Sequence, residues 1–297
     1  MTPEQAADTP TKRTRTKAVQ AATPEVPMPT SKHGQDGEGH KKADTHSTCA
    51  LAVQALRELQ AERQGFIRAR NRLNNQVLAF IRVKLGWRAD LPQKEQLAML
   101  ARSKAIQKEI ENAEITPKNE AVASLVKGIV TQFAIARDGF IEHEKLLNKN
   151  MLAAMAHTPI MQWVLDTPGI GLPSIACVIG ETGDLSLYAN PGKVWKRLGL
   201  APYEGKAYAT WRGGQDGKLS KEQWVDAGYA PKRRSVAWNV GEPAFKAAGP
   251  YRELYLERKA YEHERDAEMS KGHAHARAHR YMTKRIIRDL WRAWNEK

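Results

Sequence analysis

Apolar residues recur at alternating spacings of four and three between residues 118 and 156, and this pattern constrains the fold more than any other feature. Such spacing places one apolar seam along a long helix, as in a coiled coil. The predicted partner is either the first long helix of the chain, folded back antiparallel, or the same helix in another subunit. We interpret the one histidine in the seam as a polar residue that sets the register rather than as a ligand. The seam consists of Val122, Val126, Ile129, Phe133, Ala136, Phe140, His143 and Leu147.

The first long helix is predicted to run from Thr48, a suitable N-cap, to about Leu85. One line of its heptads is apolar (Leu59, Phe66, Leu73, Phe80), and the companion line of Leu56 and Val77 is interrupted by Arg63 and Arg70. A shorter helix is expected at about 94–113, between Pro92 and Pro117. Residues 49–157 are therefore predicted to be a helical coiled coil or hairpin, through which we expect a homo-oligomer.

Residues 1–48 are rich in Thr, Pro, Gly, Lys and Ala and poor in large apolar side chains. They cannot bury enough surface to offset the entropy of ordering, so we predict a disordered tail. No secretory signal and no membrane-spanning apolar run is recognisable. The two cysteines, Cys49 and Cys177, form neither a disulfide framework nor a zinc spacing. We expect a cytoplasmic protein without a membrane partner.

The net charge of +14 is concentrated towards the C-terminus. Residues 190–297 carry 23 lysines and arginines against 13 carboxylates. A basic surplus confined to one segment favours a polyanionic partner, most commonly nucleic acid. The alternative is a merely basic, solvated surface.

The stretch Pro168-Gly169-Ile170-Gly171 lies between two predicted helices, with Pro173 suited to the first turn of the second. Helix, glycine-rich turn and helix together are the layout of a helix-hairpin-helix motif. Its exposed backbone N–H groups can hold a phosphate without reading sequence. The alternative is an αα-corner in which the glycines only turn the chain.

Three short motifs follow one another between residues 167 and 202: Pro168–Gly171, then Glu181-Thr182-Gly183-Asp184, then Gly199-Leu200-Ala201-Pro202. In this order they resemble the C-terminal domain of the DEDD-type insertion-sequence transposases, which include Piv-type invertases and bridge-RNA-guided recombinases. The helix over 55–86 resembles that family's coiled-coil segment. The likeness is strong over about 165–202 and looser over 50–156 and 203–297. It implies binding of DNA, or of a structured RNA, in transposition and recombination.

Two parts of the family's chemistry are missing. Its RuvC-like sheet with four acidic metal ligands needs alternating strands, which residues 1–156 do not show. Its nucleophilic serine in a Ser-Gly pair is replaced here by residues 203–208 without serine, and Ser220 and Ser235 do not match that pair. We therefore expect no complete catalytic site and no cofactor, with Mg²⁺ relevant only if a RuvC-like partner supplies carboxylates. An active recombinase with an unrecognised or partner-supplied nucleophile, and a coiled-coil scaffold that needs no nucleic acid, are the alternatives.

The basic C-terminal segment contains several candidate phosphate contacts. Residues 205–220 read as a small glycine-tipped β-hairpin on which Tyr208 and Trp211 alternate with cations. Burial of both aromatic side chains is the alternative. A helix over 230–246 starts with Lys232-Arg233-Arg234, and three cations at a helix N-terminus oppose its macrodipole. An anion bound there would relieve that conflict.

The last predicted helix, 273–297, has an apolar stripe and a basic face. On that face Arg277, Lys284 and Arg288 are spaced to line up as a ridge. His275 and His279, four residues apart, could chelate a metal, but no further ligand accompanies them, and we expect none to be bound. The predicted nucleic-acid-binding residues are Pro168, Gly169, Ile170, Gly171, Lys193, Lys196, Arg197, Lys206, Arg212, Lys232, Arg233, Arg234, Arg277, Arg280, Lys284, Arg285 and Arg288.

Together these observations predict a mainly α protein. It has a disordered tail (1–48), a helical coiled-coil region (49–157), and a basic helix-hairpin-helix domain with a small β-hairpin (158–297). The expected function is transposase-like DNA binding, close to the nucleoid.

Overall fold

The computed structural model describes residues 38–202, 222–223, 228 and 230–296, with side chains from residue 47 onward. The chain is mainly helical, as predicted, and none of the described residues lies in a strand. The predicted β-hairpin at 205–220, which includes Lys206 and Arg212, lies outside the described residues. Among the described helices, none has the length and apolar character needed to cross a membrane.

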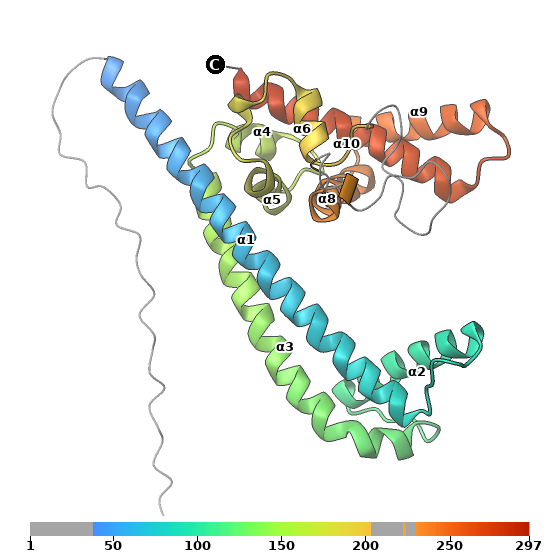
Figure 1. The fold of residues 1–297 in the computed structure, drawn as a ribbon. Coiled ribbons are helices and arrows are strands. Elements are labelled where there is room, and N and C mark those ends of the chain that lie inside the picture. Colours follow the sequence, from blue (N-terminus) through green and yellow to red (C-terminus); the bar gives the residue numbers. More distant parts are fainter. Residues whose placement is uncertain (1–37, 203–221, 224–227, 229, 297) are drawn as a thin grey trace, which may run out of the picture.

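Two long helices form an antiparallel hairpin that projects from the rest of the molecule (Figure 1). Helix α1 (Glu38–Lys84) runs outward, α2 (Gln93–Asn112) packs at the far end, and α3 (Glu120–Met155) returns along α1. The seam is therefore satisfied within one chain, which is the first of the two predicted arrangements. Association of two chains through these helices stays a prediction.

Helix α1 starts at Glu38 rather than after Thr48, so residues 38–48 are helical and do not belong to a disordered tail. Extending an existing helix costs far less than nucleating one, and no proline interrupts residues 38–48. The remainder of the predicted tail, 1–37, is outside the described residues.

The seam of α3 differs from the prediction along one of its two lines. Val126, Phe133 and Leu147 are buried as expected. The companion line is shifted by one residue, because Ala123 and Val130 are buried whereas Ile129 is 41% exposed and Ala136 is exposed. His143 accordingly lies at the edge of the seam, where its ring packs on Phe66 and its Nε2 is 3.0 Å from Glu62 Oε1.

An ion pair explains why the seam tolerates charge. Arg70 Nη1 lies 2.7 Å from Glu144 Oε1, and the Glu144 side chain is only 11% exposed. The arginine that interrupts the apolar line of α1 thus meets a carboxylate on the shifted line of α3. A pattern search for apolar residues passes over Glu144, so this buried position could not be recognised from the apolar pattern.

The remaining helices form a compact body against the N-terminal half of α1. They are α4 (Met161–Asp166), α5 (Leu172–Thr182), the short 3₁₀ helix η1 (Leu185–Leu187), α6 (Pro191–Arg197), α8 (Pro231–Lys246), α9 (Pro250–Arg265) and α10 (Lys271–Asn295). Ile175 and Ile179 of α5 and Ile286 of α10 are fully buried in the shared core. The predicted stripe of α10 is buried at Ile286, Ile287, Leu290 and Trp294, with Tyr281 and Trp291 partly covered.

Gly180 sets how closely α5 lies on α1. A Cβ at this position would be 2.5 Å from Gln60 Cβ and 2.8 Å from the backbone oxygen of Leu56. Because one of these obstacles is backbone, a side chain at position 180 could only be accommodated if the two helices moved apart. Because Gly180 has no side chain, α5 can pack directly on α1, and this contact connects the hairpin to the body.

Replacing Gly180 by alanine should lower the free energy of unfolding by about 1–3 kcal/mol, the usual cost of overpacking a core. Gly128→Ala in α3 is the matched control, because nothing lies within 4 Å of its added Cβ. That change should raise stability by about 0.5–1 kcal/mol through helix propensity. Urea unfolding of both variants measures the difference, and equal effects would contradict the close contact.

Candidate nucleic-acid interface

The glycine turn at 168–171 is packed against the end of α8. Gly169 has a φ of 76°, and a Cβ there would meet Ala247 Cβ at 2.8 Å and Ala244 Cα at 2.9 Å. Ile170 belongs to the core and is 7% exposed. Gly169 thus has a packing role, whereas Pro168 beside it is exposed, and phosphate binding by the turn stays a prediction.

The turn and the cations that were expected to act with it lie apart. The turn contacts the last residues of α8, whereas Lys232, Arg233 and Arg234 lie in its first turn. A helix of 16 residues is about 24 Å long at 1.5 Å per residue. The turn and the α8 cations do not form one phosphate site.

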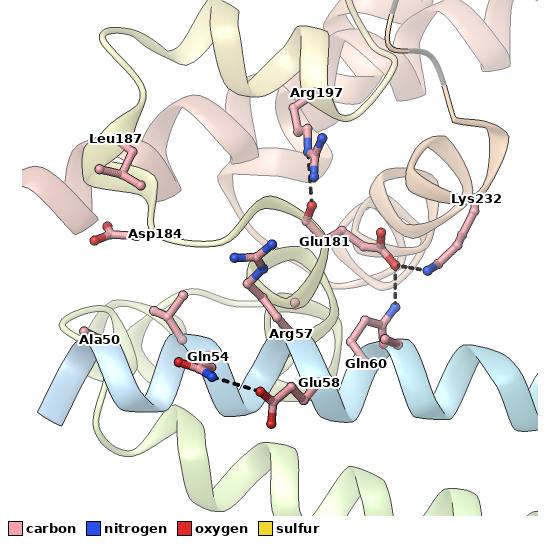
Figure 2. Close-up of a pocket in the computed structure, with 13 residues that line it drawn as sticks. Ala50, Gln54, Arg57, Glu58, Gln60, Glu181, Asp184, Leu187, Arg197 and Lys232 are labelled. Carbon is pink, nitrogen blue, oxygen red and sulfur yellow. Dashed lines mark hydrogen bonds and ion pairs between the residues drawn. The ribbon is translucent and has the colours of Figure 1, made fainter. Parts of the chain in front are cut away.

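Several of the predicted cations instead surround one buried carboxylate, Glu181, at the end of α5 (Figure 2). Lys232 Nζ is 2.9 Å from its Oε1, and Arg233 Nε is 3.7 Å from its Oε2. Gln60 of α1 donates from Nε2 to Oε1 at 3.1 Å, and Arg197 Nε donates to the backbone oxygen of Glu181 at 3.3 Å. Four helices, α1, α5, α6 and α8, therefore meet at this residue.

Glu181, Gln60, Arg197 and Lys232 line a cleft of about 740 Å³ between α1 and the body, whereas Arg233 is outside its lining. Its α1 wall includes Arg57, which Figure 2 draws without a hydrogen bond or ion pair to the other lining residues. Burial raises the pKa of the Tyr188 hydroxyl, and the positive charges of Arg197, Arg233 and Arg57 oppose that rise. Three of the side chains that line the cleft are cations, Arg57, Arg197 and Lys232, and three are carboxylates, Glu58, Glu181 and Asp184.

Glu181 resolves the predicted conflict at the start of α8. Two of the cations at this helix N-terminus contact a carboxylate of the protein itself, which also faces the positive end of the helix. The compensation is partial, because burial and the neighbouring Arg197 lower the pKa of Arg233 against the opposing effect of Glu181.

A second group of cations continues from α8 to α10. Arg234 Nη1 donates to the backbone oxygen of Gly199 at 3.4 Å. Burial, and then the charge of Arg234, lower the pKa of Arg280, whose Nε has no hydrogen-bond partner within the described part of the chain. Burial and Arg280 likewise lower the pKa of Lys284, whose ammonium lies 5.3 Å from the centre of the Trp195 ring. The positive charges of Arg234, Arg280 and Lys284 thus lie close together and are partly shielded from water. A bound anion would stabilise their charged forms.

Two of the three cations on the predicted ridge, Arg277 and Arg288, are paired with carboxylates of the protein, and Lys284 packs near Trp195. Arg277 Nη1 is 3.0 Å from Oε2 of Glu262, which is 1% exposed. Arg258 and Arg265 bind the same carboxylate at 2.6 and 3.1 Å. Arg288 pairs with Asp289 at 2.8 Å, and Arg285 donates to the Tyr281 hydroxyl at 2.8 Å. Lys193 and Lys196 are exposed on α6.

Sequence reasoning missed two contributors to the cleft. Arg57 and Gln60 lie in the N-terminal half of α1, whereas the sequence indicated nucleic-acid contact only for the basic C-terminal half of this helix. Glu181 was noticed only within the Glu-Thr-Gly-Asp step, and its part as a counter-charge was not predicted. The one local clue was Gly180, because a glycine inside an apolar helix indicates a close approach of another backbone.

The histidines of α10 form an aromatic cluster. His279 is fully buried and stacks on Trp238 with ring centres 3.8 Å apart, while His275 Nδ1 lies 2.8 Å from the Tyr255 hydroxyl. Burial lowers the pKa of His279 to about 4, against the attraction of Glu242. Over the ranges that the structure describes, no group of three or more potential metal ligands was found.

The buried His279 predicts a loss of stability in mild acid. Its folded pKa of about 4 lies below the usual value of 6.5, so the unfolded chain takes up a proton first. Stability present above pH 6.5 should fall by about 2 kcal/mol on going to pH 5. His279→Gln should remove most of this slope in urea unfolding at a series of pH values. The control His143→Gln should retain it, and an unchanged slope in the His279 variant would refute the assignment.

Arg277 is predicted to contribute more to folding than to ligand binding. Arg277→Gln should cost about 1.5 kcal/mol, because one charged hydrogen bond to Glu262 is lost while the other two arginines remain. Lys271→Gln, at an exposed position of the same helix, is the control for charge and should leave stability nearly unchanged. Thermal and urea unfolding measure both. A drop in DNA affinity without a drop in stability would place Arg277 at the interface instead.

No protein-family model matches this chain, and no match was found among curated proteins or among solved structures.

Proposed function

We propose that this protein binds nucleic acid through the sugar-phosphate backbone, with the cleft around Glu181 as its main phosphate-binding surface. The observation that carries the proposal is the convergence of Arg57, Arg197 and Lys232, from three helices, on the lining of one cleft, with Arg233 beside them at Glu181. Arginine and lysine side chains at such a surface bind phosphates without reading bases. The exposed Lys193 and Lys196 extend the positive charge along α6.

We further propose that the binding serves DNA transposition or recombination. The support is the resemblance of residues 167–202 to the C-terminal domain of DEDD-type transposases. Glu181 and Gly183 of that motif shape the cleft here: Glu181 binds its cations, and a Cβ at Gly183 would lie 3.7 Å from Arg57 Cδ. In this proposal DNA is the partner, in the cytoplasm near the nucleoid. A separate RuvC-like subunit would supply any metal-dependent strand cleavage.

The experiment is a titration of a short DNA duplex, followed by fluorescence anisotropy, at several salt concentrations. Binding through phosphates predicts that log K falls linearly with log salt, with a slope of about −0.9 for each phosphate contact. Removing two cleft charges with Arg57→Gln and Arg197→Gln should weaken binding at least about tenfold and make the slope shallower by about 2. Neither arginine forms an ion pair with a carboxylate of the described chain, so the fold should persist.

The matched control is Lys104→Gln with Lys108→Gln. Both lysines are exposed on α2 at the far end of the hairpin, and their loss changes the net charge equally. It should change affinity less than about threefold. Binding that barely responds to salt, or equal losses in the two double variants, would contradict the proposal.

A further inference from the structure

Glu181 occupies the position in the cleft that is best placed to hold an anion. Its Oε1 receives the ammonium of Lys232 at 2.9 Å and the amide of Gln60 at 3.1 Å, and its Oε2 faces Arg233. The side chain of Glu181 is 7% exposed, so its negative charge is largely removed from water. The carboxylate of Glu181 thus already pairs with Lys232 and Arg233, the cations that would otherwise bind a phosphate.

The other two carboxylates of the cleft have different partners. Glu58 accepts a hydrogen bond from Gln54 at 3.0 Å. Asp184 accepts from the backbone of Ser186 and from Trp294 Nε1, at 2.8 and 2.9 Å. Among the residues that line the cleft, Glu181 is therefore the carboxylate in contact with its cations.

The same position holds an unused polar atom. Gln60 is 1% exposed, and its Oε1 has no hydrogen-bond partner within the described chain. A buried acceptor left open costs free energy unless a water or a ligand group reaches it. This oxygen accepts hydrogen bonds, so a water or a ligand hydroxyl can satisfy it, whereas a phosphate oxygen, itself an acceptor, cannot.

We propose that Glu181 is a built-in counter-anion that competes with a phosphate group of the ligand for Lys232 and Arg233. This inference rests on the proposed function only in taking the ligand's phosphate from a nucleic acid. Lys232 is 37% exposed and has a flexible stem, so its ammonium can turn from Glu181 to a phosphate at the mouth of the cleft. A single phosphate competes poorly with a tethered carboxylate, whereas a strand with several phosphates gains enough contacts to displace it.

Two other roles for Glu181 predict different outcomes. If Glu181 only clamps α1 and α8 to α5, its neutralisation loosens the cleft and weakens anion binding. If it is a metal ligand for catalysis, its neutralisation abolishes Mg²⁺-dependent behaviour and leaves binding in EDTA unchanged. Of the three roles, only competition between Glu181 and the ligand predicts that neutralising Glu181 makes the protein bind anions more tightly in the absence of a metal.

The test is Glu181→Gln, which keeps the shape of the side chain and the possibility of a hydrogen bond to Gln60. Isothermal titration with inorganic pyrophosphate, and anisotropy with the DNA duplex, are carried out in EDTA. We expect Glu181→Gln to bind both at least about tenfold tighter, since close charge pairs are coupled by more than 1.4 kcal/mol. Glu58→Gln removes the same charge from the same cleft without touching these cations, and it should tighten binding by less than about threefold.

A folding check keeps the result interpretable. Loss of the carboxylate leaves Lys232 and Arg233 facing each other, so Glu181→Gln should melt earlier without ligand. Pyrophosphate should then raise its melting temperature more than that of the wild type, because at a fixed ligand concentration the stabilisation of the folded state grows with the logarithm of the affinity. If Glu181→Gln does not fold, Glu181→Asp serves instead, because the shorter side chain draws the carboxylate away from Lys232. It should bind pyrophosphate with intermediate affinity.

The two proposals fail separately. Glu181→Gln binding no tighter than Glu58→Gln would overturn the competition, even if the wild type binds DNA with a steep salt slope. Tighter pyrophosphate binding by Glu181→Gln, without any DNA binding by either protein, would support the competition and remove nucleic acid as the ligand.

Discussion

The contact between α1 and α5 at Gly180 is the constraint on which the rest of the structure depends. It allows the backbone of Leu56 and the stem of Gln60 to lie against α5 with no side chain between them. The hairpin is joined to the body through this contact, and Gln60 is thereby brought within hydrogen-bonding distance of Glu181. The same register places Arg57 on the wall of the cleft. Gly180 and the charged cleft are adjacent because the close approach of α1 and α5 at Gly180 also brings the side chains of the cleft together.

Buried carboxylates organise the abundant positive charge of this protein. Glu144 receives Arg70 in the hairpin, Glu262 receives Arg258, Arg265 and Arg277 between α9 and α10, and Glu181 receives Lys232 and Arg233 in the cleft. An uncompensated buried charge is costly, so each acidic position requires basic neighbours. Much of the basic surplus of the C-terminal region is therefore structural. Glu181 differs from the other two in lying on a cleft, where an external anion can reach the same cations.

The helices were predictable because their signals are local. Pro92, Pro117 and the periodic apolar residues located α2 and α3 to within a few residues, and Pro231 correctly marked the start of α8. The start of α1 was placed too late because helix extension is cheap and leaves little trace in composition. The shifted seam of α3 has another cause: residues 122 and 123 suit a heptad equally, and only the partner helix selects between them. Of the candidate phosphate contacts, Arg197, Lys232 and Arg233 lie together, whereas the glycine turn and Arg277 have packing partners.

The sequence by itself determined the helical class, the long helices with their apolar seam and the concentration of positive charge, since periodicity and composition depend on neighbouring residues only. That the seam pairs within one chain was decided by the tertiary structure. The tertiary structure decided which cations are free to meet a ligand and which are bound to buried carboxylates. It also decided that Gly169 packs against α8 and that Arg57, far away in the chain, belongs to the cleft. Charge pairing across long sequence separations depends on distances in space, and these arise only when the helices pack.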